Sequence, residues 1–230
     1  GDMTGTALNK PIVGMVATST GRGYWLVASD GGIFSFGDAT FYGSTGALTL
    51  NSPIVGMAAT HTGAGYWLVA ADGGVFSYGD ATFYGSTGAI KLNRPIVAML
   101  STKTSQGYWL LADDGGIFTF GDALFHGSGP GRGFSESFAG LIPTLDGSGY
   151  ALVHTNGTVT PFGASSLSGA SACDPWPVTD MSIAGEGAVV LRTPDVVPNE
   201  APSKHSAQMD ARYLESFIFH TQSCQIDVPL

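Results

Sequence analysis

The chain is built on a sequence repeat. The stretch from Gly23 to Ala39 reads GYWLVASDGGIFSFGDA, and closely similar copies begin at Gly65 and Gly107. A more divergent fourth copy begins at Gly149, so successive copies start 42 residues apart. A fixed period of this length is typical of folds in which each unit buries its apolar face against its neighbours. The period therefore constrains the fold more than any other feature of the sequence.

Each repeat predicts four β-strands. In the first repeat the apolar runs are residues 12–18, 24–29, 33–36 and a shorter run at 40–42. Glycine-rich segments separate these runs, and glycine accepts the positive φ that tight turns need. Four antiparallel strands in about 42 residues make one blade of a β-propeller. No convincing helical periodicity occurs before residue 205.

We therefore expect an all-β, five-bladed β-propeller, formed as a single domain over residues 1–230. The expected blades are about 11–52, 53–94, 95–135, 136–172 and, for the fifth, 178–230 together with 1–10. Residues 1–10 have the sequence of the end of a blade, since Leu8 lies 42 residues before Leu50. Pairing of this N-terminal segment with the last blade would close the ring and leave no free sheet edge.

The end of the chain departs from the repeat. Residues 194–230 form a non-repeat tail or insertion, in which 207–215 predict a short helix and 217–220 and 224–228 predict strands. This tail either finishes the fifth blade or reaches a partner as an arm. A β-trefoil is the alternative fold, because three units of about 42 residues also suit it; the fourth copy argues against it.

Charge and hydropathy exclude several classes of partner. The formal net charge is −9, so the chain has no basic stripe for nucleic acid and is not expected to adhere to an anionic membrane. No run of about 18 apolar residues is present, so no membrane insertion is expected. No signal peptide opens the sequence, and Gly1 reads as the start of a mature or trimmed product.

The repeat resembles that of a known family. The GYWLVASDGGIFSFGDA unit with the FYGSTG that follows it is similar to the tandem repeat of secreted and cell-surface proteins of actinobacteria. The resemblance covers about residues 8–170 and is specific in the first three copies. In that family the repeat often accompanies cell-wall hydrolases or other extracellular enzymes. The resemblance implies a secreted, propeller-like accessory module of a larger protein, and it carries over no catalytic residue.

The two cysteines, Cys173 and Cys224, both lie where the repeat fails. The Ser-, Thr- and Gly-rich composition, with few lysines, favours a disulfide between them in an oxidising compartment. Such a bridge would hold the tail against the loop after the fourth repeat; two buried free thiols are the alternative. No Cys/His spacing predicts zinc, and we expect neither a metal nor a cofactor.

The repeated aspartates raise the question of bound calcium. In the first repeat Asp30 and Asp38 flank a strand of about seven residues, which spans about 23 Å. The two carboxylates therefore lie at opposite ends of the strand and cannot share an ion. Capping of the turns by these carboxylates is the simpler interpretation.

The repeated aromatic residues are candidate ligand-binding residues, because aromatic faces stack on sugar rings. The candidates are Trp25, Trp67, Trp109, Tyr42, Tyr84 and His126. For the tryptophans, packing between blades is the favoured alternative. The other three lie near the expected blade tips, where packing and binding are about equally expected. Several weak sites on one rigid body would bind a surface with avidity.

An enzyme of this fold needs acids that converge on the central channel, as in five-bladed glycosidases. The first strands at 12–18, 54–60 and 96–102 contain no Asp or Glu. We therefore expect no catalytic residue and predict a secreted or cell-surface module that recognises a cell-surface glycan or protein. The alternatives are a glycan-active hydrolase with its site in the channel, and a structural subunit that assembles through 194–230.

Overall fold

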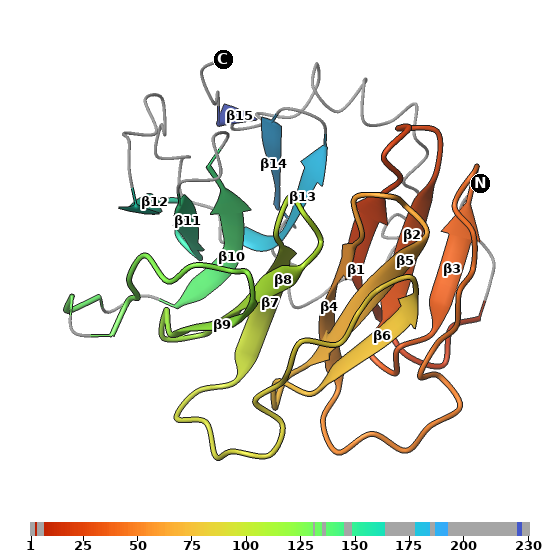
Figure 1. Ribbon diagram of the computed structural model, residues 1–230, viewed down its shortest axis with the longest axis horizontal. Coiled ribbons are helices and arrows are strands. Elements are labelled where there is room, and N and C mark those ends of the chain that lie inside the picture. Colours follow the sequence, from red (N-terminus) through yellow and green to blue (C-terminus); the bar gives the residue numbers. More distant parts are fainter. Residues whose placement is uncertain are drawn as a thin grey trace, which may run out of the picture.

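The structure is a computed structural model, and in the residues that it describes all regular structure is β (Figure 1). It describes residues 3, 7–130, 132–134, 137–144 and 149–163, together with the backbone of 178–184, 187–192 and 225–226. The all-β class predicted from the repeat is confirmed for this part of the chain. The short helix predicted at 207–215 lies outside the described residues.

In the described part of the chain the strands form five three-stranded antiparallel sheets, each made of three successive described strands. The strands of the first three sheets are β1 (Ile12–Ala17), β2 (Tyr24–Ala28), β3 (Ile33–Phe36), β4 (Ile54–Ala59), β5 (Gly65–Ala70), β6 (Val75–Gly79), β7 (Ile96–Ser101), β8 (Gly107–Ala112) and β9 (Ile117–Gly121). Those of the last two are β10 (Phe138–Pro143), β11 (Gly149–His154), β12 (Val159–Gly163), β13 (Val178–Ala184), β14 (Gly187–Arg192) and β15 (Gln225–Ile226).

The middle strands of the first four sheets form the core. Every residue of β2, β5, β8 and β11 is buried. Successive sheets pack face to face, so that Trp25 of the first sheet shares a cluster with Tyr66 and Leu68 of the second. A strand covered on both faces needs apolar residues at consecutive positions, which is why these strands read as continuous apolar runs.

The first strands of the sheets lie next to one another. Strand β4 contacts β1 and β7, β10 contacts β7 and β13, and β13 also contacts β1. In Figure 1, β13 lies between β10 and β1. The fifth sheet therefore neighbours both the fourth and the first, although it is the last in sequence.

The predicted fourth strand at 40–42 is wrong. Residues 39–43 form no strand, and the backbone groups of Thr40, Tyr42 and Gly43 bond to side chains instead of a strand partner. The indole N–H of Trp25 donates to the carbonyl of Thr40 at 2.8 Å, and the N–H of Tyr42 donates to the hydroxyl oxygen of Tyr66 at 3.1 Å. The linker after each third strand thus gains its hydrogen bonds without extending the sheet.

One buried tyrosine per repeat holds this linker. The hydroxyls of Tyr66 and Tyr108 each donate to a linker carbonyl at 2.6 Å, Gly43 and Gly85 respectively. The hydroxyl of Tyr150 does the same in the next repeat. Burial raises the pKa of all three phenols above their ordinary value of 10.0, so they remain proton donors at neutral pH. We call these contacts the tyrosine anchors.

The Asp-Gly-Gly turn is locked to the linker as well. The carboxylate of Asp30 accepts the N–H of Gly32 at 2.9 Å, which confirms that this aspartate caps its turn. Gly31 has a φ of 78°, and a Cβ added there would lie 1.6 Å from Oγ1 of Thr45. Thr45 is fully buried and donates its hydroxyl to the carbonyl of Asp30 at 3.0 Å.

The N-terminal segment packs on the first sheet. Met3 and Leu8 lie in one cluster with Tyr24 and Leu26. Leu50, which is 42 residues after Leu8, packs in the same way against the second sheet. Residues 1, 2 and 4–6 lie outside the described part, so pairing of 1–10 with the last blade stays a prediction.

Removal of one anchor hydroxyl should destabilise the protein. In Tyr66→Phe the N–H of Tyr42 and the carbonyl of Gly43 lose their buried partner, and we expect a loss of about 1–3 kcal/mol in the free energy of unfolding. The matched control is Tyr78→Phe, because the first repeat carries Phe36 at that position. Urea denaturation measures the free energy of unfolding of both variants. An equal loss in Tyr66→Phe and Tyr78→Phe would contradict the role given to the Tyr66 hydroxyl.

The two glycines of the Asp-Gly-Gly turn should differ in how well they tolerate substitution by alanine. Gly31→Ala combines a left-handed backbone with a clash at Thr45, and we expect it to lose more than about 2 kcal/mol. Gly32→Ala meets its nearest atom, Oδ1 of Asp30, at 3.1 Å, and its φ is not positive. Thermal unfolding should therefore show the larger loss for Gly31→Ala, and equal losses would contradict this account.

Candidate binding surface

The three tryptophans predicted as ligand candidates are buried between sheets. Trp25, Trp67 and Trp109 have exposed fractions of 0%, 0% and 6%. Each indole packs on the anchor tyrosine of the next sheet, and each N–H donates to a linker carbonyl at 2.8 Å. Stacking of a sugar on these rings would need an exposed face, and this position offers none.

Tyr42, Tyr84 and His126, the other predicted candidates, are half-buried at equivalent positions in three linkers. Each ring meets an anchor tyrosine edge to face, with centroids 5.6–5.9 Å apart. The hydroxyls of Tyr42 and Tyr84 donate at 3.2 Å to the carbonyls of Gly63 and Ser105. These side chains therefore serve the packing between repeats and offer a ligand only part of a ring.

The residue before each of these positions is exposed. Phe41, Phe83 and Phe125 have exposed fractions of 57%, 56% and 59%. In the first linker, the backbone carbonyl of Thr40 and the N–H of Tyr42, on either side of Phe41, are both engaged by the hydrogen bonds described above. The sequence analysis missed these phenylalanines, although their 42-residue spacing was the signal that could have identified them.

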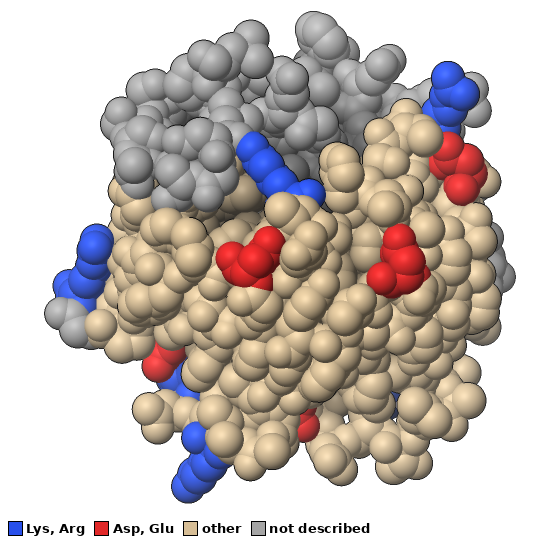
Figure 2. All heavy atoms as spheres, in the orientation of Figure 1, with Lys and Arg blue, Asp and Glu red and all other residues tan. Residues whose placement is uncertain are grey.

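Further apolar side chains extend this surface. Leu48, Ile90 and Leu124 have exposed fractions of 57–66%, and all lie in the same linkers as the phenylalanines. The face of the molecule in Figure 2 carries few charged residues, and they are scattered. We call Phe41, Phe83 and Phe125 the rim phenylalanines. The described chain thus presents one exposed aromatic ring in each of three consecutive linkers.

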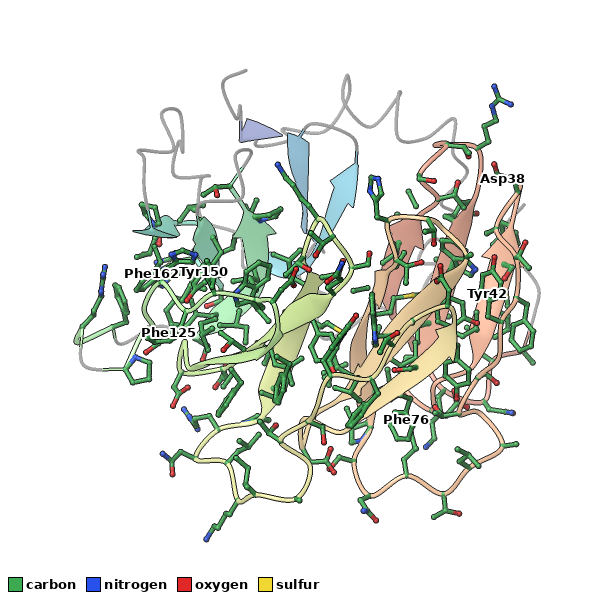
Figure 3. All side chains as sticks on the ribbon, in the orientation of Figure 1. Asp38, Tyr42, Phe76, Phe125, Tyr150 and Phe162 are labelled. Atoms are coloured by element: carbon green, nitrogen blue, oxygen red, sulfur yellow. The ribbon has the colours of Figure 1, made fainter. Side chains whose placement is uncertain are left out.

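A second repeated feature is an aspartate that joins the end of the third strand to a hairpin turn. Figure 3 shows Asp38 at the end of β3, with Tyr42 further along the linker. The hydroxyls of Thr18 and Thr20 donate to the two carboxylate oxygens of Asp38 at 2.8 and 2.5 Å. These hydrogen bonds, that from Thr20 first, lower the pKa of Asp38 below its ordinary value of 3.8. Asp80 and Asp122 accept equivalent bonds.

The first strands of the first four sheets line an open cavity of about 280 Å³. Its described lining comes from β1, β4, β7 and β10 and contains no charged residue and no histidine. Among the described residues, no group of three or more His, Cys, Asp or Glu side chains could hold a metal ion. The described part of the cavity therefore lacks the paired carboxylates that glycoside hydrolysis needs.

Cys173 and Cys224 lie outside the described residues, so their disulfide stays a prediction.

Comparisons with known proteins do not identify the chain. No family model matches it, and no curated protein matches it. In the part of the chain that the structure describes, no helix is long and apolar enough to cross a membrane.

The hydrogen bonds that Asp38 accepts from Thr18 and Thr20, here called the aspartate clamp, should shift the pKa of Asp38 in a defined direction. In Thr20→Val the first of the hydrogen bonds to Asp38 is lost, so we expect the pKa of Asp38 to rise towards 3.8, measured by carboxyl NMR titration. A carboxyl with a depressed folded-state pKa stabilises the fold above its unfolded pKa, and this contribution disappears as the pH falls through the folded value. Thr49→Val, in an exposed linker position, is the control. An unchanged Asp38 pKa in Thr20→Val would contradict the clamp.

Proposed function

We propose that the chain is a non-catalytic, extracellular binding module that recognises a cell-surface glycan through the rim phenylalanines. The observation that carries this proposal is the recurrence of one exposed ring at the same position in three linkers. Singly exposed apolar residues are normal on protein surfaces, so the support comes from the repetition of the ring and from the exposed Leu48, Ile90 and Leu124 in the same linkers. The same proposal includes secretion of the chain and a disulfide between Cys173 and Cys224. It also treats the chain as part of a larger protein and as one that needs no cofactor.

We also propose that the five sheets form a closed five-bladed propeller. The contacts of β13 with both β10 and β1 support this, because they make the last sheet a neighbour of the first. The position of Leu8 on the first sheet, equivalent to that of Leu50 on the second, supports it too. A closed ring would hold the rim phenylalanines at fixed angles around one rigid body.

The chemistry of the rim favours a neutral glycan. A phenylalanine face offers apolar area to the C–H face of a sugar, and the linker around it is rich in Ser, Thr and Gly, which supply hydrogen bonds. Each site is small and weak on its own. Repetition on one body converts weak sites into useful affinity when the partner is also repetitive, as a polysaccharide is.

The alternative functions receive less support from the described residues. A hydrolase in the channel needs two carboxylates, and the described cavity lining provides none. Assembly through residues 194–230 concerns a segment that lies almost wholly outside the described part. The binding experiment described below distinguishes a protein partner at the rim phenylalanines from a glycan.

The triple variant Phe41→Ala/Phe83→Ala/Phe125→Ala should lose glycan binding and keep its fold, because all three rings are exposed. On a glycan array followed by surface titration, we expect each single variant to weaken the avidity about three- to tenfold and the triple variant to abolish it. Circular dichroism checks the fold.

The matched control is Leu48→Ala/Ile90→Ala, which removes exposed apolar area from the same linkers without touching an aromatic ring. This variant should bind like the parent. Retention of glycan binding by the triple variant, or the absence of any bound glycan for the parent, would overturn the proposal. If the parent binds a protein target but no glycan, and the triple variant loses that protein binding, the rim phenylalanines bind a protein partner.

A further inference from the structure

The turn between β11 and β12 differs in sequence from the equivalent turns of the first three sheets. Those turns are Asp-Gly-Gly and begin at Asp30, Asp72 and Asp114. The fourth, a further 42 residues along, is Asn156-Gly157-Thr158. Asn156 is exposed, and Gly157 keeps the left-handed backbone of its counterparts with a φ of 85°. An uncharged carboxamide thus stands where the other turns carry a carboxylate.

The side-chain oxygen of Asn156 accepts two hydrogen bonds. The backbone N–H of Thr158 donates to Oδ1 at 2.9 Å, and the Thr158 hydroxyl donates to the same atom at 2.8 Å. In the first turn the equivalent donor to Asp30 is the N–H of Gly32, and glycine has no hydroxyl to add. Two donors on one carbonyl oxygen make its carbon more electrophilic and stabilise the negative charge that the oxygen gains when a nucleophile adds.

A nucleophile for this carbon is the next backbone nitrogen, that of Gly157. Its attack on Cγ of Asn156 closes a five-membered ring within the chain, so no second molecule has to be brought into place. A Cβ on the residue after the asparagine hinders this approach, and glycine has none. Asn156-Gly157 is the one Asn-Gly pair in the sequence. The residues that follow the other asparagines are Lys10, Ser52, Arg94 and Glu200.

We infer that Asn156 is a site of spontaneous deamidation in the folded chain, assisted by the hydroxyl of Thr158. Water removes the proton from the N–H of Gly157, the nitrogen bonds to Cγ of Asn156, and the Cγ–Nδ2 bond breaks. Nδ2 takes up a proton and leaves as ammonia, and the ring that remains is a succinimide. Water then opens the succinimide at either carbonyl, which gives aspartate or isoaspartate. One water is consumed and one ammonia released, and no oxidant or reductant is needed.

One hydrogen bond of the turn opposes the reaction. The N–H of Gly157 donates to the carbonyl of His154 at 2.9 Å, and this bond must open before the nitrogen can attack. Local opening of an exposed turn needs much less free energy than global unfolding. The fold therefore slows the attack without preventing it, while the two donors to Oδ1 favour it.

The two products have different consequences for the turn. Aspartate at position 156 is the residue that the other three turns already carry, so this product keeps the turn and adds one negative charge. Isoaspartate inserts one extra methylene into the main chain between β11 and β12, and β11 is buried along its whole length. This inference does not depend on the proposed function of the rim phenylalanines.

Peptide mapping by mass spectrometry tests the site directly. The purified full chain is incubated at neutral pH in water labelled with heavy oxygen. We expect time-dependent conversion of Asn156 to a mixture of aspartate and isoaspartate that carries the heavy oxygen. Asn51, which is exposed and followed by Ser52, is the internal control and should stay intact. No conversion of Asn156, or equal conversion of Asn51, would overturn the inference.

Variants of Thr158 test the assistance by its hydroxyl. Thr158→Val keeps the shape and the backbone N–H, and we expect it to slow deamidation of the folded chain roughly three- to tenfold, less than in a water-excluded site. Thr158→Ser keeps a hydroxyl and should react like the parent. In urea, where the hydroxyl is no longer held against Oδ1, the parent and Thr158→Val should react at the same rate. Equal rates for the two folded chains, or the same slowing in urea, would overturn the inference.

Discussion

The buried hydroxyl of one tyrosine per repeat is the interaction on which the rest of the structure depends. Tyr66 accepts an N–H from the preceding linker and donates to a carbonyl of the same linker, and Tyr108 and Tyr150 repeat this arrangement. An irregular segment packed between two sheets carries backbone groups that would otherwise be unsatisfied, at a cost of about 1–3 kcal/mol each. The anchors satisfy two of them per linker and bind each sheet to the next. In Figure 3, Tyr150 lies beside Phe162, a ring of the fourth sheet with its centroid 6.0 Å away.

The exposed surface follows from the same constraint. The backbone carbonyl of Thr40 and the N–H of Tyr42 are held by Trp25 and Tyr66, and the side chain of Phe41 between them is exposed. The repeat copies this geometry at Phe83 and Phe125. The same linker therefore packs the sheets together and sets the spacing of the rim phenylalanines.

The sequence predicts the fold better than it predicts the sites. Period, glycine turns and apolar runs indicate three strands of each repeat, since these depend on local patterning and a constant environment. The fourth strand was wrong because the pairing of residues 40–42 is decided by Tyr66, which lies 24 residues further along the chain. Phe41 looked like a strand residue, and its exposure depends on those same distant contacts.

Hydrogen exchange of the linker amides tests the central claim most directly. The amides of Tyr42, Tyr84 and His126 lie outside any strand, and each donates to an anchor hydroxyl. If the anchors hold the sheets together, these amides exchange only through global unfolding, with the same opening free energy as amides of β5 and β8. Exchange at the rate of an exposed loop amide, such as that of Thr49, would contradict it.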